Sequence, residues 1–122
     1  MPNILVIDDN ASVRKAITLM LESGGHSVLG AKDGSEGMRV FESAEPDLVI
    51  VDIIMPDKDG IEIIREMRRS RPGTRIIAMT GGGQFPNLDF LKMARAFGAL
   101  DALAKPIDPD DLVSRVEACL AN

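Results

Sequence analysis

The sequence predicts an α/β fold in which a five-stranded parallel sheet lies between two layers of helices. Two observations predict it: short apolar runs recur along the chain, and the segments between them carry apolar residues at helical spacing. Parallel strands need long, right-handed crossovers, so the alternation indicates a three-layer α/β/α sandwich. No linker or shift in composition divides the chain, and we expect residues 1–122 to form one domain.

The expected strands are the apolar runs themselves. They lie at residues 4–7, 28–29, 48–51, 76–79 and 99–103. The stronger runs are aliphatic throughout, which is typical of strands that are buried on both faces. Because the only aromatic residues are four Phe, the core between sheet and helices must be aliphatic as well.

The expected helices are marked by their apolar faces and by the residues that begin and end them. Apolar residues recur on one face at Val13, Ile17, Met20 and Leu21, and again at Leu112, Val116 and Leu120. Helix starts are indicated by Asn10, by Asp33 with Glu36 in a capping-box pattern, and by Asp108 before Pro109. Helix ends and returns to the sheet are indicated by Gly24–Gly25, Pro46, Arg71–Gly73 and Gly98.

The charge balance argues against a protein that binds nucleic acid directly. The formal net charge is −5 and the pI is about 4.8, whereas binding to a phosphate backbone needs a basic patch. The one basic cluster consists of Arg65, Arg68, Arg69 and Arg71. Glu62 and Glu66 interleave with these arginines at helical spacing, which predicts a solvated, ion-paired helix face.

The single cysteine and the apolar runs bear on the compartment. Cys119 lies among apolar residues and is expected to be a buried thiol, which fits a reducing environment. No apolar run approaches the length that spans a membrane, and the first residues do not resemble a signal peptide. We therefore expect a cytoplasmic protein without membrane insertion.

A set of polar residues follows the apolar runs, at the points where the strands are expected to end. Asp8 and Asp9 end the first strand, Asp52 the third and Thr80 the fourth, and Lys105, before Pro106, lies just beyond the fifth. In an open parallel sheet, ligands bind beyond the carboxyl ends of the strands. We therefore expect these residues to meet along one edge of the sheet, although alone Asp8 with Asp9 could be an ordinary cap, Thr80 an ordinary hydroxyl and Lys105 a surface charge.

These residue types indicate phosphoryl transfer. Three carboxylates in one place repel each other unless a cation compensates, and oxygen ligands of this kind suit Mg²⁺. The Lys105 ammonium can neutralise charge on a phosphoryl group, and the Thr80 hydroxyl can donate a hydrogen bond to it. Asp52, directly after four aliphatic residues, is the expected nucleophile, because a carboxylate can attack phosphorus to give an aspartyl phosphate.

At these residues the chain resembles the receiver domain of two-component response regulators, from Ile4 to about Leu120. The matching pieces are Val6-Ile7-Asp8-Asp9-Asn10, Val51-Asp52-Ile53-Ile54-Met55-Pro56-Asp57-Lys58-Asp59-Gly60, Met79-Thr80 and Lys105-Pro106. The resemblance implies a flavodoxin-like (βα)5 fold with strand order 2-1-3-4-5. It also implies that Asp52 accepts phosphate from a histidine kinase or a histidine phosphotransfer protein.

The resemblance also implies roles for the other site residues. Mg²⁺ would be held by Asp9, Asp52 and the backbone carbonyl of Ile54, with Asp8 acting largely through water. Thr80 would bind the phosphoryl group and shift on activation, Lys105 would pair with that group, and the Lys105–Pro106 bond would be cis. Pro56 and Gly60 would shape the loop after Asp52, and residues 88–103 with residues 112–120 would form the surface that meets the output partner.

The sequence departs from the family pattern at three places. Ala102 stands where receivers usually carry Tyr or Phe, so the usual coupling of the threonine to an aromatic ring is in question. The segment from Gly81 to Pro86 is rich in glycine, and its flexibility could replace that ring as the signalling element. Ile54 and Gly82 occupy positions that tune hydrolysis in the family, and neither side chain can hydrogen-bond a water, which predicts slow self-dephosphorylation.

Other functions are compatible with parts of the pattern. We expect a stand-alone receiver that signals by docking or onward relay, but a fragment of a longer regulator or a pseudo-receiver that binds partners without phosphorylation stays open. A phosphatase of the haloacid dehalogenase type would need an acid two residues after the nucleophile, where Ile54 stands. A nucleotide- or flavin-binding protein would need a glycine-rich loop after the first strand, where residues 8–12 are Asp-Asp-Asn-Ala-Ser.

Overall fold

The computed structural model describes residues 2–55, 59–81 and 87–121, and in these ranges strands and helices alternate along the chain. Pro56 and Gly82, and most of the glycine-rich segment 81–86, lie outside the described residues. The elements are β1 (Asn3–Ile7), α1 (Ala11–Ser23), β2 (Ser27–Ala31), α2 (Gly34–Ala44), β3 (Leu48–Asp52), α3 (Gly60–Ser70), β4 (Ile76–Gly81), α4 (Asn87–Phe97), β5 (Asp101–Lys105) and α5 (Pro109–Leu120).

The five strands form one parallel sheet in the order β2-β1-β3-β4-β5, as the family resemblance implied. In the register of the sheet, Ile7 lies beside Val51, Asp52 beside Met79, and Gly81 beside Lys105. Strands that run in the same direction end at the same edge, so the residues at these ends are brought together. Sequence positions nearly one hundred residues apart therefore share one edge of the sheet.

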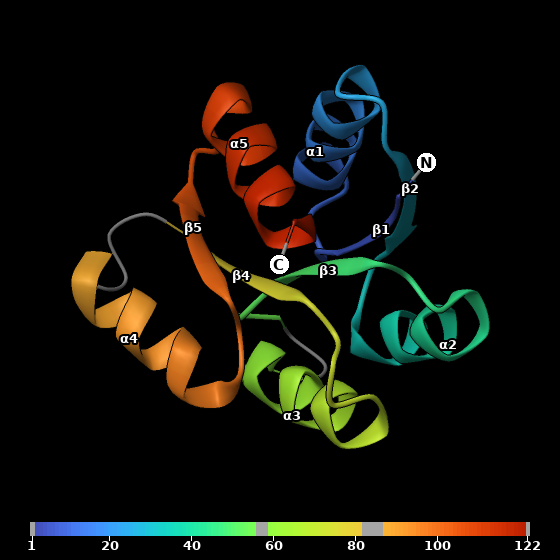
Figure 1. Cartoon of the computed structure of the whole chain (residues 1–122), viewed down its shortest axis with the longest axis vertical. Coiled ribbons are helices and arrows are strands. Elements are labelled where there is room, and N and C mark those ends of the chain that lie inside the picture. The colour runs from blue at the N-terminus through green and yellow to red at the C-terminus, as the bar shows by residue number, and fades with distance from the viewer. Residues whose placement is uncertain (1, 56–58, 82–86, 122) are drawn as a thin grey trace.

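The sheet separates the core into two apolar layers (Figure 1). One layer packs α1 and α5 against the sheet through residues such as Leu21 and Val116. The other packs α2, α3 and α4 against the opposite face through Phe41, Met67 and Phe90. The central strands β1, β3 and β4 are buried almost throughout, as their aliphatic sequences predicted, whereas the edge strands β2 and β5 are partly exposed.

Four helices begin at a side chain that accepts a hydrogen bond from the first helical turn. The predicted caps Asn10, Asp33 and Asp108 are confirmed, and each accepts from the backbone N–H three residues later. Asp59 does the same for α3, with Glu62 in its first turn, although the sequence analysis did not predict it. These caps fix where each helix leaves the edge of the sheet at which the polar residues lie.

The last strand differs from its expected position. An apolar run at residues 99–103 predicted the strand there with Lys105 just beyond it, but β5 spans Asp101–Lys105 and ends at the lysine. Ala99 instead closes the end of α4 through a hydrogen bond from its N–H to the Ala94 carbonyl. The Leu100 N–H donates a hydrogen bond to the Ile76 carbonyl of β4, directly before β5 begins. Apolar character alone therefore misplaced the start of this strand.

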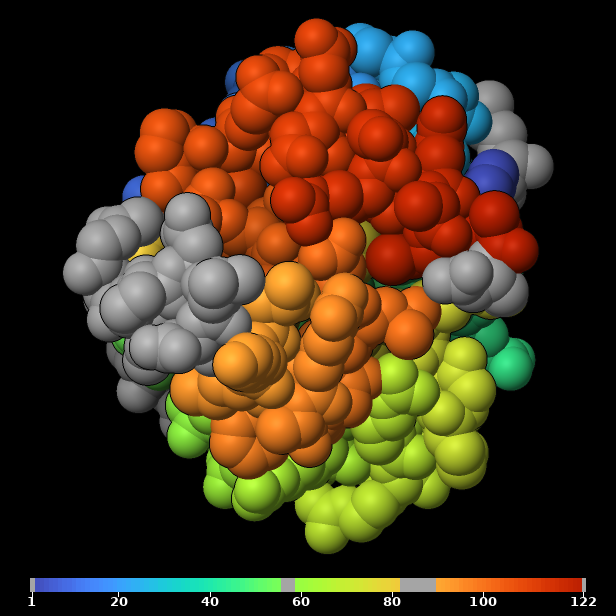
Figure 2. All heavy atoms as spheres, turned by 60° about the vertical axis from the view of Figure 1, so that its left-hand side comes forward, coloured from blue at the N-terminus to red at the C-terminus, as the bar shows by residue number. Residues whose placement is uncertain are grey.

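The arginine cluster on α3 makes contacts that are largely structural. Arg68 donates to the Gly98 and Pro72 carbonyls, and Arg71 donates to the Phe41 carbonyl. Arg65 lies 4.9 Å from the centre of the Phe97 ring, so it links α3 to α4. These contacts hold α3 against α2 and α4. Figure 2 shows the face on which α5, α4 and α3 lie one after another across the surface.

Two further expectations concern burial and length. Cys119 is buried and free, as predicted, and burial raises the pKa of its thiol. Within the described residues, no helix combines the length and apolar character that a bilayer crossing requires.

Candidate functional site

Asp8, Asp52 and Lys105 converge at the carboxyl ends of the strands. Asp52 is the last residue of β3, Asp8 directly follows β1, and Lys105 ends β5. Asp8 is fully buried and Asp52 is 4% exposed, whereas Asp9 is exposed. Buried carboxylates need a compensating charge, and the structure places one between them.

The Lys105 ammonium bridges the two buried carboxylates. Its Nζ lies 2.9 Å from Asp8 Oδ2 and 3.1 Å from Asp52 Oδ2. The contact with Asp52 is also a hydrogen bond, whereas the one with Asp8 has the distance of an ion pair without hydrogen-bond direction, so Asp8 Oδ2 has no hydrogen-bond partner in the described chain. A single lysine therefore compensates two carboxylates incompletely.

The second oxygen of each buried carboxylate is held by the backbone. Asp8 Oδ1 accepts from the Asn10 N–H at 2.9 Å, and Asp52 Oδ1 accepts from the Ile54 N–H at 3.2 Å. Gly60 at the start of α3 packs against the end of β3, where a Cβ would lie 2.4 Å from the Asp52 carbonyl oxygen. This close approach requires glycine, which agrees with the loop-shaping role predicted for Gly60.

The charges shift the pKa values of the central pair upward. Burial raises the pKa of Asp52 above its usual 3.8, and the charge of Asp8 adds to this, although Lys105 opposes both effects. Burial alone would lower the pKa of Lys105, but the contacts with Asp8 and Asp52 outweigh it and raise that pKa above 10.5. Lys105 is therefore charged at neutral pH, and negative charge at Asp52 is costly unless more positive charge is supplied.

The acidic residues fit a hard divalent cation. One carboxylate oxygen from each of Asp8, Asp9 and Asp52 lies within 4.8 Å of the others. The buried Asp8 Oδ2 without a hydrogen-bond partner is suited to a metal-bound water, and three carboxylates are the ligand type that Mg²⁺ prefers. Ile54 follows Asp52 by two residues with its side chain 49% exposed, and the role of its carbonyl stays a prediction.

Thr80 lies in β4 between the strands that carry Asp52 and Lys105. It is 2% exposed and pairs in register with Ala104, the neighbour of Lys105. Its hydroxyl contacts the Gly81 carbonyl at 3.5 Å, a length at which a hydrogen bond is weak. The structure thus brings all five predicted site residues to one edge of the sheet, and the Lys105–Pro106 bond is cis as the resemblance implied.

Ala102 lies half-buried in β5, where the family usually has an aromatic ring. A hollow of about 300 Å³ opens beside it, lined by Phe90, Leu91, Ala104 and Arg115 among others. Arg115 is held there by Asp101 at 2.7 Å and Asp111 at 2.9 Å. Phe90 and Leu91 of α4 thus line this hollow, and β5 contributes no aromatic side chain to it.

Arg14 belongs to the site although the sequence analysis did not single it out. Its Nη1 donates to the Asp8 backbone carbonyl at 2.6 Å, and its side chain lies half-buried against β2. An arginine in the first turns of a helix is usually a surface charge. Only the fold shows that this one reaches back to the turn that carries two of the three carboxylates.

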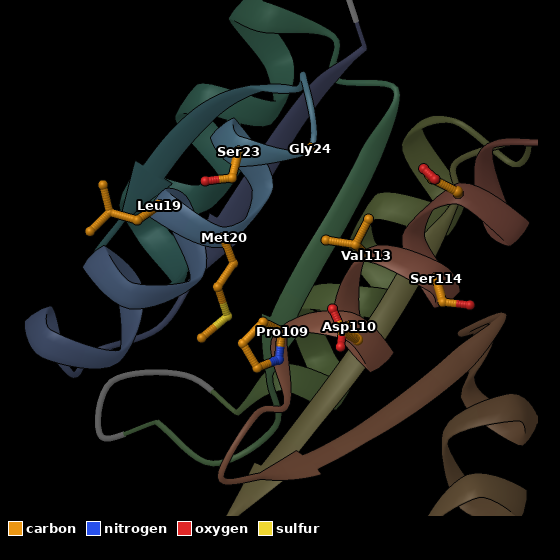
Figure 3. Close-up of a pocket in the computed structure, with 9 residues that line it drawn as sticks. Leu19, Met20, Ser23, Gly24, Pro109, Asp110, Val113 and Ser114 are labelled. Carbon is orange, nitrogen blue, oxygen red and sulfur yellow. The ribbon is translucent and has the colours of Figure 1, made fainter.

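Two of the hollows beside α1 differ in their relation to the site. A groove of about 670 Å³ runs between α1 and α5, lined by Leu19, Met20, Ser23, Gly24, Pro109, Asp110, Val113, Ser114 and Glu117, and contains none of the predicted site residues (Figure 3). A smaller apolar hollow of about 250 Å³ adjoins the site, where Val13, Ile17 and Met20 face Lys105 and Pro106. Size alone therefore does not identify the functional site of this chain.

Comparison with known proteins shows which family the chain resembles. The family model for the response regulator receiver domain matches residues 4–117. The chain is 34% identical over 118 residues to the transcriptional regulatory protein GlrR of Escherichia coli, covering 97% of this chain but only 26% of that protein. It is 32% identical over 122 residues to the protein PilH of Pseudomonas aeruginosa, covering 100% of both. A receiver domain structure from Clostridium thermocellum matches with a TM-score of 0.88 and 35% identity over 99% of this chain and 95% of that one.

Proposed function

Because this chain belongs to the response regulator receiver domain family of two-component systems, we propose that it accepts a phosphoryl group on Asp52. The observation that carries the proposal is the buried Asp52 carboxylate with the Lys105 ammonium 3.1 Å away. In the step, an Asp52 oxygen forms a bond to phosphorus while the bond from phosphorus to the donor's imidazole nitrogen breaks. The imidazole keeps that electron pair. The protein is a signalling phosphoacceptor that assists its own phosphorylation and dephosphorylation.

Each site residue has a role in this step. Asp8, Asp9, Asp52 and the Ile54 carbonyl would hold Mg²⁺, which when bound supplies positive charge to the oxygens of the phosphoryl group. Lys105, now shared by two carboxylates, turns part of its charge to the phosphoryl oxygens. The Thr80 hydroxyl donates a hydrogen bond to the same group. Burial of Asp8 and Asp52 excludes most water and strengthens these interactions.

The phosphodonor is the phosphohistidine of a histidine kinase or of a histidine phosphotransfer protein. The apolar hollow beside Lys105 supports this, because Val13, Met20 and Pro106 offer a partner an apolar contact next to the reacting carboxylate. The surface formed by α4, β5 and α5 is proposed for the output partner, by phosphorylation-dependent docking or onward relay. Residence in the cytoplasm remains a prediction.

The test is the intact mass of the protein after incubation with acetyl phosphate, with and without Mg²⁺. A single phosphoryl adduct that requires Mg²⁺ and is absent from Asp52→Ala is the expected result. Asp110→Ala, which removes an exposed carboxylate outside the site, should form the adduct like the unaltered chain. An adduct that persists in Asp52→Ala, or its absence under every condition, would contradict the proposal.

A further inference from the structure

Among the described residues, Arg14 is the one residue outside the acidic turn whose side chain hydrogen-bonds to the backbone of that turn. Its Nη1 donates to the carbonyl oxygen of Asp8 at 2.6 Å, the short distance of a hydrogen bond with a charged donor. The backbone N–H of the same residue donates to the Asn10 carbonyl at 3.0 Å. Arg14 therefore contacts the turn from Asp8 to Asn10 from both ends.

The Asp8 carbonyl matters because it belongs to the peptide unit between Asp8 and Asp9. Asp8 itself is fixed independently: its N–H donates to the Ala31 carbonyl at 3.1 Å, and its carboxylate accepts from the Asn10 N–H. The Asp9 carboxylate, by contrast, has no hydrogen bond or ion pair with another described residue. The orientation of the Asp8–Asp9 peptide sets the direction in which the Asp9 side chain leaves the backbone, and one Asp9 carboxylate oxygen lies within 4.8 Å of those of Asp8 and Asp52.

A glycine in the neighbouring strand makes room for this contact. Gly30 in β2 lies against the Arg14 side chain, and a Cβ at residue 30 would be 3.3 Å from Arg14 Cδ and 3.6 Å from its Nε. A larger residue there would displace the arginine stem without altering its charge. Gly30 and Arg14 thus form a pair whose effect on the turn can be tested without removing a charge.

We propose that Arg14 is a positioning residue for cation binding, which orients the Asp8–Asp9 peptide so that Asp9 joins the acidic cluster. The inference rests on the cation site of the proposed function. The charge of Arg14 and its positioning of Asp9 have opposite effects on Mg²⁺ affinity, so the direction of the change in an Arg14 variant distinguishes them. A positive charge beside an acidic site repels Mg²⁺, so removal of Arg14 should tighten binding if charge alone matters. If Arg14 positions Asp9, its removal weakens binding.

The test is the Mg²⁺ dissociation constant, measured by NMR titration of the folded protein well below its unfolding temperature. Arg14→Gln is expected to weaken Mg²⁺ binding about tenfold, as for other residues that orient metal ligands. Lys15→Gln removes the same charge from an exposed neighbour on α1 and should leave binding equal or slightly tighter. Gly30→Val should weaken binding in the unaltered chain but add nothing in the Arg14→Gln background, because the contact is already lost.

The outcomes separate this inference from the function on which it rests. Saturable Mg²⁺ binding that is unchanged or tighter in Arg14→Gln overturns the positioning role and leaves the cation site intact. A Gly30→Val effect that is equal in both backgrounds also overturns it. If Arg14→Gln does not fold, unchanged affinity in Gly30→Val decides against the proposal. No saturable binding by the unaltered chain overturns the cation site itself, and the inference with it.

Discussion

Replacement of Lys105 by methionine removes the charge that compensates two buried carboxylates and keeps much of the side-chain volume. The ammonium lies 2.9 Å from Asp8 Oδ2 and 3.1 Å from Asp52 Oδ2. At an effective dielectric constant of about 20, each contact corresponds to about 5 kcal/mol of Coulomb attraction, much of which desolvation of the lysine offsets. Because the Lys105 side chain is still partly exposed, we expect Lys105→Met to lower the free energy of unfolding by about 2–4 kcal/mol at pH 7 without Mg²⁺.

Protonation of Asp52 in the folded variant limits this loss of stability, so the loss depends on pH. Without Lys105, the pKa of Asp52 rises further above 3.8, because the hydrogen bond and charge of the lysine lower it more than the Ile54 N–H does. Protonating a carboxylate of ordinary pKa at pH 7 costs about 4 kcal/mol, which sets the upper bound. Where the folded variant carries this extra proton, its stability recovers as pH falls, by about 1.4 kcal/mol per unit. The deficit relative to the unaltered chain therefore narrows from pH 7 toward pH 5.

The assay is urea unfolding followed by far-ultraviolet circular dichroism, since the chain has no Trp or Tyr to report by fluorescence. Lys92→Met, which removes an exposed lysine from α4, is the matched control and should change stability by less than about 0.5 kcal/mol. Equal unfolding free energies for Lys105→Met and the unaltered chain at pH 7 would refute the reasoning. So would a deficit that stays constant between pH 7 and pH 5.

Two further predictions concern the loop after Asp52. Ile54→Asn should speed loss of the phosphoryl group from Asp52 about fivefold, because one hydrogen bond to the attacking water contributes about 1 kcal/mol. The rate is measured by the decay of the phosphoryl adduct in the mass spectrum. Decay at an unchanged rate would contradict the slow hydrolysis attributed to Ile54. Gly60→Ala should lower the free energy of unfolding by about 1–3 kcal/mol, because its Cβ would lie 2.4 Å from the Asp52 carbonyl oxygen. Gly73→Ala, whose Cβ would meet nothing within 4 Å, should unfold like the unaltered chain, and an equal loss in both would show that the close approach is not the cause.

The sequence was most informative where a charged residue follows a run of buried aliphatic residues. Asp52 follows four aliphatic residues, so a carboxylate there needs a partner or a function, and the structure places Lys105 beside it. The strand order came from the family resemblance and not from periodicity, because alternation of strands and helices fixes a parallel sheet but not its order. The layers and the edge at which the site lies follow from that alternation, and both are confirmed.

Features that depend on contacts between elements could not be predicted. The contact of Arg14 with the Asp8 carbonyl and its packing against Gly30 of β2 are examples, and no spacing within α1 signals either of them. Lys105 was placed beyond the fifth strand because the apolar run begins at Ala99, whereas backbone pairing with β4 decides where β5 lies. Asp59 could have been found, since Asp59 and Glu62 repeat the spacing of Asp33 and Glu36.

The site residues come from different faces of the sheet that divides the core. Along a strand, alternate side chains point to opposite faces. Asp52 shares the face of Ile50, and Lys105 that of Leu103, which both pack with α1 and α5. Thr80 shares the face of Ala78, which packs with α2, α3 and α4. The charged residues and the hydroxyl thus reach one edge from opposite sides of the sheet, and Thr80 is the site residue on the side that packs with α4.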